Sequence, residues 1–154
     1  MREPDDQIDR LLRRRRRVIG LFVAAPFVAM IVTAYSVAPR SMGYGTAGEL
    51  GFADCSYLAR TGYPCPTCGM TTSVSAMARG RIGFAFRAHP FGVLLFPAAV
   101  ILGGMGAFQA VSGRRVLAKL RFRWWYLAIA FGLLMAGWIW LREAGAADGR
   151  WPID

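Results

Sequence analysis

The sequence predicts an all-α integral membrane protein with three transmembrane helices. The prediction rests on three apolar segments without a charged side chain, at residues 18–37, 91–111 and 124–141. A helix needs about 20 mostly apolar residues to cross a bilayer, within a range of about 17–25. The composition agrees, because 55% of the 154 residues are hydrophobic, a high share for a soluble domain. We therefore expect one membrane domain over residues 18–141.

The first span follows a run of arginines that fixes its orientation. All residues from 13 to 17 are arginine, and moving so many guanidinium groups across a bilayer is unfavourable. Residues 1–17 should therefore form a basic cytoplasmic tail. Residues 1–12 are charged and lack an apolar face, so we expect them to be disordered. The apolar segment exceeds the about 7–15 residues of a signal-peptide core, which favours an uncleaved anchor.

A second basic cluster lies between the second and third spans. It comprises Arg114, Arg115, Lys119, Arg121 and Arg123. Two spans separate the two clusters, so both fall on the cytoplasmic side. The loop at residues 38–90 and the tail at residues 142–154 then lie outside the cytoplasm, in a multi-pass protein of the plasma (inner) membrane. Clustered cations beside apolar spans predict contact with anionic lipid. No recognition module for nucleic acid accompanies the net charge of +10.

The outer loop should carry a short interfacial helix ahead of the second span. Apolar residues at helical spacing share one face of residues 69–79, and Gly80 is placed to end that helix. These residues are Met70, Val74 and Met77, and Phe84 and Phe86 follow them. We expect residues 65–91 to be mostly helical and to lie against the membrane. Pro90 suits the first turn of the second span.

Small residues at four-residue spacing mark one stripe on each span. The stripes are Ala25, Ala29 and Thr33; Ala99, Gly103 and Ala107; and Ala128, Gly132 and Ala136. Such stripes let helices approach closely in lipid, so they predict a compact three-helix bundle. Aromatic residues mark the two ends of the third span, with Trp138 and Trp140 near its outer end.

The motif Cys65-Pro66-Thr67-Cys68-Gly69 stands just before the predicted loop helix. Unpaired N–H groups and the dipole at a helix start favour a thiolate and lower its pKa. A third cysteine, Cys55, precedes the motif by a segment short enough to return. We therefore expect Cys55, Cys65 and Cys68 to cluster in space.

The surroundings of the motif resemble a known family. The matching residues are Cys55, Thr61-Gly62-Tyr63-Pro64-Cys65-Pro66-Thr67-Cys68-Gly69-Met70-Thr71, Gly80, Ala85-Phe86 and His89-Pro90. They resemble the bacterial family described as domain of unknown function 2752, whose members look like small membrane proteins with a Thr-Gly-x-x-Cys-Pro-x-Cys-Gly-x-Thr core. The resemblance covers roughly residues 55–96. Family members often carry Arg at the position of Thr72 and Asn at that of His89. The resemblance implies a membrane protein and singles out the cysteines, but it does not imply a particular reaction.

Three interpretations of the cysteines remain open. In the first, a disulfide fastens the outer loop. Either Cys65 pairs with Cys68, or Cys55 pairs with one of them across a loop of about ten residues, whose closure contributes about 2–3 kcal/mol. In the second, Cys65 attacks and Cys68 resolves in thiol–disulfide exchange, although no thioredoxin-like pattern surrounds them. In the third, Cys55, Cys65, Cys68 and His89 bind zinc as a Cys₃His set.

The sequence favours the first interpretation. We expect an accessory or interaction protein with an unidentified protein partner, rather than an enzyme, and with no cofactor. A membrane-bound oxidoreductase that uses Cys65 and Cys68 as catalytic residues is the alternative, and a zinc-binding membrane protein is the second alternative. The spans carry no ionisable side chain, so they offer no relay for ions or protons.

Overall fold

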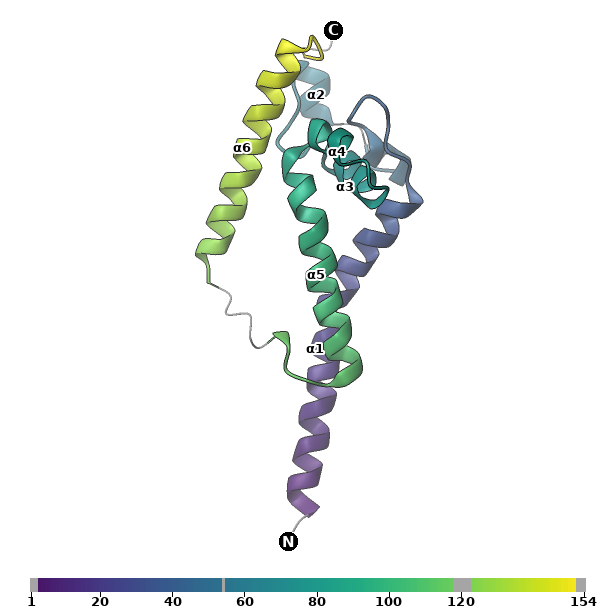
Figure 1. Ribbon diagram of the computed structural model, residues 1–154, viewed down its shortest axis with the longest axis vertical. Coiled ribbons are helices and arrows are strands. Elements are labelled where there is room, and N and C mark those ends of the chain that lie inside the picture. The colour runs from purple at the N-terminus through teal and green to yellow at the C-terminus, as the bar shows by residue number, and fades with distance from the viewer. Residues whose placement is uncertain (1–2, 54, 118–122, 152–154) are drawn as a thin grey trace. The chain divides into compact units, whose positions relative to one another are not determined.

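The computed structural model describes residues 3–53, 55–117 and 123–151. Its elements in chain order (Figure 1) are α1 (Glu3–Ser36), the 3₁₀ helix η1 (Thr46–Leu50), α2 (Ser56–Thr61), α3 (Met70–Ala78), α4 (Ile82–Ala88), α5 (Pro90–Ser112) and α6 (Trp125–Ala147). Within these ranges there is no β-strand, so the predicted all-α class is confirmed. In the same ranges, three helices are long and apolar enough to cross a membrane, namely α1, α5 and α6.

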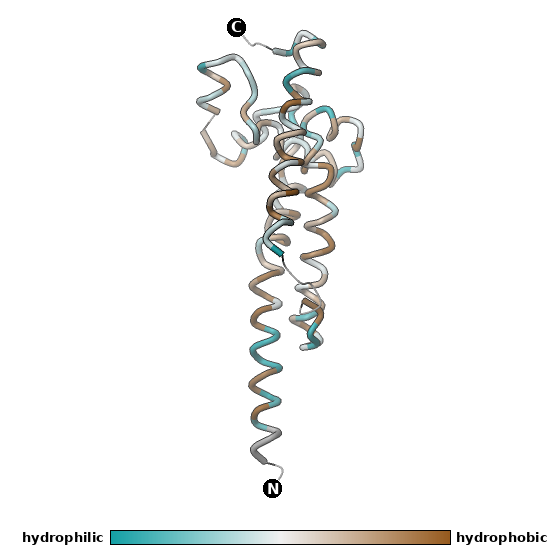
Figure 2. The backbone as a smooth tube through the Cα atoms, turned by 90° about the vertical axis from the view of Figure 1, so that its left-hand side faces the viewer, coloured by the Kyte–Doolittle hydropathy of each residue, from teal (hydrophilic) through white to brown (hydrophobic). Residues whose placement is uncertain are grey.

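The predicted disorder of residues 1–12 is wrong for the described part, because α1 begins at Glu3. The helix thus continues upstream of the apolar span through the arginine run. Arginine and leucine have high helix propensity, and extending an existing helix needs no new nucleation. Figure 2 shows hydrophilic and hydrophobic residues alternating along this stretch, ahead of the apolar part of α1. Residues 1 and 2 lie outside the described ranges.

The chain divides into two compact units, and the first joins the start of α1 to the end of α5. It comprises the described residues of Met1–Ile31 and Ala98–Phe122. Here the two helices lie side by side with their backbones almost touching (Figure 1). A Cβ on Gly20 would lie 2.6 Å from the amide nitrogen of Ala110, and a Cβ on Gly106 would lie 2.9 Å from that of Ala24. Glycine allows this approach because it has no side chain.

The predicted stripe of small residues is confirmed in part on α5 and is wrong on α1. On α5, Ala99 is fully buried. Gly103 does pack closely, since a Cβ there would lie 3.0 Å from that of Phe27. On α1, however, the packed residues are Gly20 and Ala24, whereas Ala25 and Ala29 are exposed. Successive helical residues are about 100° apart around the axis, so the stripe was assigned to the wrong face.

The second unit contains the loop at residues 38–90, α6 and the adjoining ends of α1 and α5, over the described residues of Val32–Pro97 and Arg123–Asp154. Arg79, directly after α3, forms hydrogen bonds with the C-terminal end of α1. Its guanidinium donates to the carbonyl oxygens of Ala34 and Tyr35, both at 2.8 Å. Carbonyls in the last turn of a helix have no partner within the helix, so this contact stabilises the end of α1 at Ser36.

The prediction that residues 65–91 are mostly helical is confirmed by α3 and α4. Gly80 has a φ of +71° and donates its amide to Met77 at 3.0 Å, as the predicted cap requires. Pro90 opens α5, also as predicted. Helix α3 is buried on its polar side as well as its apolar side, and its buried residues include Thr72, Ser73, Val74 and Ser75. It therefore lies inside this unit, while α4 exposes Ile82 and Phe86.

The C-terminal segment folds back onto the end of α6. Helix α6 continues past the predicted span end to Ala147. Trp151 is buried, occupies the space that a Cβ on Gly145 would need, and has its ring centroid 5.1 Å from that of Tyr44. This contact joins the residues directly after α6 to the loop at residues 38–90.

Candidate cysteine site

The structure brings all three cysteines together, which confirms the predicted cluster. The sulfur atoms of Cys55, Cys65 and Cys68 lie within 4.8 Å of one another. Cys65 and Cys68 are closest, with 3.1 Å between their sulfurs. All three are free thiols and half-buried. Cys55 immediately precedes α2, and the other two lie in the turn that leads into α3.

The turn has a fixed backbone shape. The amide of Cys68 donates to the carbonyl of Cys65 at 3.0 Å, and Gly69 ends the turn with a φ of +81°. A Cβ on Gly69 would collide with the carbonyl oxygen of Ala88 and would lie 2.9 Å from that of Gly43. The glycine of the motif is thus required both by its backbone conformation and by two neighbouring segments.

Two ring nitrogens hold the carbonyls on either side of Cys65. Trp138 on α6 donates its Nε1–H to the carbonyl of Pro64 at 2.7 Å. His89 lies with its Nε2 3.1 Å from the carbonyl oxygen of Pro66. Because a proline has no amide hydrogen, these carbonyls are the only backbone hydrogen-bonding groups of the two residues. The position of Cys65 is therefore set by contacts with α6 and with the residue before α5.

His89 is a structural link rather than a neighbour of the sulfurs. Its side chain is buried, and its Nδ1 accepts the amide hydrogen of Phe91 at 3.2 Å, as a cap of α5. Nδ1 is thus unprotonated, so Nε2 carries the hydrogen and donates to Pro66. Burial lowers the pKa of His89, and the hydrogen bond to Pro66 partly opposes that shift. Gly137 makes room for the ring, because a Cβ there would lie 3.3 Å from Cε1.

The two cysteines of the motif differ strongly in acidity. Burial raises the pKa of Cys65, but hydrogen bonds from Thr67 and Cys68 outweigh it and lower the pKa to about 7. The hydroxyl of Thr67 lies 3.3 Å from the Cys65 sulfur. Burial raises the pKa of Cys68 above its usual range, and its hydrogen bond to Cys65 adds to the shift. Near neutral pH, Cys65 is therefore divided between thiol and thiolate, whereas Cys68 is a thiol.

A cavity of about 280 Å³ opens over the sulfurs. Its lining includes the three cysteines together with Thr46, Thr67, Thr71 and Thr72. The hydroxyls of Thr46 and Thr72 are buried and lie 2.7 Å apart, and Thr46 also accepts the amide hydrogen of Arg40 at 3.1 Å. The lining of the cavity is thus polar at these two threonines. The cavity also adjoins all three cysteine sulfurs.

Sequence reasoning missed several contributors to this site. Thr67 lies inside the motif, and its hydroxyl at a Cys-x-x-Cys pair was an available signal. Trp138 was assigned to the end of a span as an interfacial aromatic, and nothing in the sequence linked it to Pro64. Thr46 lies far from the motif in the chain, so only the tertiary structure reveals its role.

The donor set suits a soft metal ion in part. Three thiolates within 4.8 Å of one another could supply three ligands to zinc. Both ring nitrogens of His89 are engaged with backbone groups, so the structure does not bring this residue to the sulfurs. Among the described residues, these three cysteines are the only side chains of this kind that lie together here.

A family model described as a protein of unknown function, DUF2752, matches residues 55–103. The match confirms the resemblance drawn from the cysteine motif, and extends it along α5 to residue 103. Neither the curated proteins nor the solved structures contain a significant match to this chain.

Proposed function

We propose that the protein is a membrane-bound thiol–disulfide exchange protein in which Cys65 attacks and Cys68 resolves. The proposal rests mainly on the contacts of the Cys65 sulfur. It lies 3.1 Å from the Cys68 sulfur and 3.3 Å from the hydroxyl oxygen of Thr67. A thiolate is the attacking species in disulfide exchange, and an attacking thiol is most effective when its pKa is near the ambient pH. The lowered pKa of Cys65, about 7, meets that condition.

The reaction balances with the dithiol and a disulfide-bearing partner alone. The Cys65 thiolate attacks one sulfur of the partner disulfide, forms a mixed disulfide and expels a partner thiolate. Cys68 then gives its proton to that thiolate and attacks the Cys65 sulfur. A Cys65–Cys68 disulfide forms, and the second partner sulfur leaves as a thiolate. The partner disulfide is reduced by two electrons, the dithiol is oxidised by two, and the reverse sequence oxidises a partner dithiol.

Cys55 extends this chemistry by one further exchange. Its sulfur lies within 4.8 Å of both others. A Cys65–Cys68 disulfide is therefore within reach of Cys55, whose attack on Cys68 would transfer the bond to a Cys55–Cys68 pair and free Cys65. Cys55 would act as a relay, with no change in the number of oxidised sulfurs.

The orientation that suits this function places the cysteines outside the cytoplasm of a bacterial plasma membrane. Arginines at residues 13–17 and the basic cluster after α5 support this arrangement, because both are predicted to stay on the cytoplasmic side. Disulfides form and persist outside the cytoplasm, where partners with disulfides are available. A reporter fused after Asp154 should be active outside the cytoplasm, and activity inside would reverse the arrangement.

A permanent disulfide that fastens the outer loop of an accessory protein is the competing function. The same short distance between sulfurs favours it, as does the rigid support from Trp138 and His89. The two functions differ in one respect. A fastening disulfide never opens, whereas an exchange protein passes through a mixed disulfide with its partner.

Trapping that mixed disulfide tests the proposal. In intact cells, Cys68→Ser removes the resolving thiol, so Cys65 should accumulate in adducts with partner proteins that disappear on reduction. The matched controls are Cys65→Ser, which should trap nothing through the motif, and Cys55→Ser, which should leave trapping by the Cys68→Ser background intact. A membrane-impermeant maleimide should label a fraction of wild-type Cys65 without reductant. Labelling only after reduction, with no trapped adduct, would establish the permanent disulfide.

A further inference from the structure

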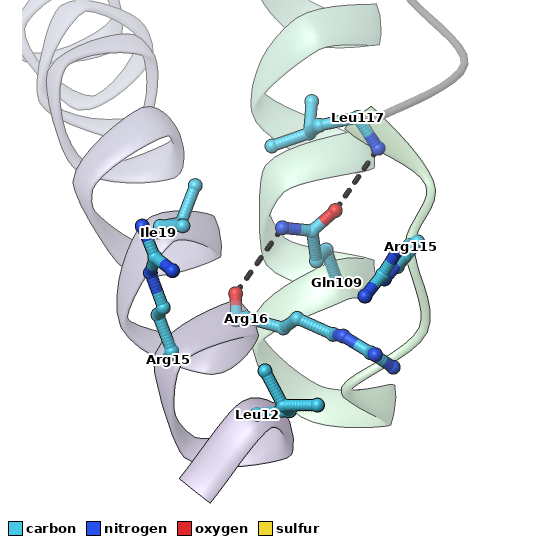
Figure 3. Close-up of a pocket in the computed structure, with 7 residues that line it drawn as sticks. All are labelled: Leu12, Arg15, Arg16, Ile19, Gln109, Arg115 and Leu117. Atoms are coloured by element: carbon cyan, nitrogen blue, oxygen red, sulfur yellow. Dashed lines mark hydrogen bonds between the residues drawn. The ribbon is translucent and has the colours of Figure 1, made fainter.

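A cavity of about 380 Å³ lies in the first unit, far along the chain from the cysteines. It is drawn in Figure 3 and is lined by Leu12, Arg15, Arg16, Ile19, Gln109, Arg115 and Leu117. Residues from α1, from α5 and from the segment after α5 thus meet around one hollow.

Gln109 holds these three segments in place. Its side chain is 4% exposed, so its amide needs partners inside the protein. It donates to the carbonyl of Arg16 at 3.1 Å and accepts the amide hydrogens of Val116 and Leu117 at 3.1 and 2.9 Å. The close helix contacts at Gly20 and Gly106 lie next to it. These hydrogen bonds therefore fix the backbone segments that carry the arginines of the cavity.

The cavity gathers positive charge with no acidic group in its described lining. Arg15, Arg16 and Arg115 contribute guanidinium groups. Figure 3 shows Arg16 extending from α1 toward Arg115, which approaches from the opposite side. The ion pairs within the described ranges, Arg40–Glu49 and Arg150–Asp148, involve none of the three. Like charges brought together on a fixed frame are stabilised by a shared anion.

The remaining lining is apolar and adjoins the span. Leu12, Ile19 and Leu117 form it, and Ile19 is 44% exposed. The uncharged stretch of α1 begins at Val18, directly after the arginines. Guanidinium groups beside apolar surface at the start of a span match a phosphate joined to acyl chains. A small soluble anion would make no use of the apolar walls.

We propose that this cavity binds the headgroup phosphate of an anionic membrane phospholipid through Arg16 and Arg115, with the acyl chains along Ile19 and Leu117. The site is independent of the cysteine chemistry, because all its residues lie in the first unit. It is distinct from general attraction between a basic surface and an anionic bilayer, since it depends on which arginines are present rather than on how many.

Native mass spectrometry of the full chain in detergent tests the site. The probes are phosphatidylglycerol and phosphatidylcholine with the same acyl chains. The double variant Arg16→Gln and Arg115→Gln is compared with the control Arg14→Gln and Arg114→Gln, which removes the same charge from α1 and from the same loop, outside the cavity. Glutamine keeps helix propensity, and the Gln109 contact uses only the backbone of Arg16. The single variants Arg115→Gln and Arg114→Gln repeat the comparison without altering α1.

We expect the wild type to retain phosphatidylglycerol over phosphatidylcholine. The cavity double variant should bind phosphatidylglycerol at least about tenfold more weakly than the control, since only this variant loses direct guanidinium–phosphate hydrogen bonds, each of which contributes about tenfold or more. Equal loss in both variants, or no loss in either, would overturn the proposal. Displacement of the lipid by glycerol 3-phosphate at the same concentration would mean a site for soluble phosphate and would also overturn it.

Discussion

The Nε2 nitrogen of His89 lies 3.1 Å from the carbonyl oxygen of Pro66, and this contact joins the cysteine turn to the start of α5. The same ring caps α5 through the amide of Phe91 at 3.2 Å. The ring thus acts as a positioning group for the sulfur.

Two substitutions of His89 should distinguish the contributions of its two hydrogen bonds to stability. His89→Ala leaves the Pro66 carbonyl and the Phe91 amide without partners in a buried place, and each unpaired group costs about 1–3 kcal/mol. In His89→Asn, the asparagine side chain can still cap α5, but it is too short to donate to the carbonyl of Pro66 as well. We expect His89→Ala to lower the free energy of unfolding in mild detergent by about 2–6 kcal/mol, and His89→Asn by about half as much. Equal losses would show that the cap contributes nothing.

Acidification should destabilise the protein through His89. Burial lowers the pKa of His89 below its ordinary value of 6.5. Below about pH 6.5 the unfolded chain therefore binds a proton that the folded protein does not, so the free energy of unfolding decreases as the pH falls, and the contribution is constant above that point. Unfolding midpoints between about pH 5 and 6.5 should show this slope in the wild type and less of it in His89→Asn. Identical slopes in the wild type and in His89→Asn would show that His89 does not cause this pH dependence.

Gly69→Ala should disrupt the cysteine turn. The substitution strains a φ of +81° and drives a Cβ into the carbonyl oxygen of Ala88. We expect a loss of at least about 3 kcal/mol in the free energy of unfolding, or no folded protein. Gly80→Ala is the matched control, because Gly80 has a φ of +71° but no described atom within 4 Å of the new Cβ. Gly80→Ala should lower the free energy of unfolding by only about 1 kcal/mol, through backbone strain alone. Similar losses for both variants would mean that the contact with Ala88 does not contribute to the effect of Gly69→Ala.

Gly20→Ala should loosen the contact between α1 and α5. The new Cβ would lie 2.6 Å from the amide nitrogen of Ala110, so one of the helices must shift. Gly104→Ala on α5 meets no described atom within 4 Å and gains helix propensity. In thermal unfolding, the first variant should melt several degrees below the wild type and the second should melt at the same temperature or above it. Reversed shifts would mean that the two helices do not pack through this face.

The sequence was sufficient for the helical class, because long uncharged apolar segments have few other structures available to them. The motif before α3 also predicted the cluster, since only two residues separate Cys65 from Cys68 and a short segment joins Cys55 to them. Which face of each helix packs was not predictable, because Ala24 and Ala25 have the same chemistry and only the partner helix distinguishes them. The helical start of α1 was missed because its own charged residues do not reveal the support that it gains from the apolar stretch after it.

The site was only partly predictable for a similar reason. His89 carried a metal-binding residue type, but its surroundings direct both nitrogens to backbone groups. The support from Trp138 joins residues far apart in the chain, and no pattern along the sequence encodes such a pair. Thr67 was adjacent to the cysteines, yet its effect on the acidity of Cys65 depends on a distance of 3.3 Å.

The reaction of the reduced, purified protein with a small symmetrical disulfide, followed against pH with the modified cysteine identified by mass spectrometry, tests the central claim most directly. Cys65 should react first, with a midpoint near pH 7, and the product should be the Cys65–Cys68 disulfide with release of both small thiols. In Thr67→Val the midpoint should move upward, because a hydrogen bond to the thiolate is lost. First reaction at Cys55 or Cys68, or a midpoint for Cys65 at its ordinary value of 9.0, would contradict the proposal.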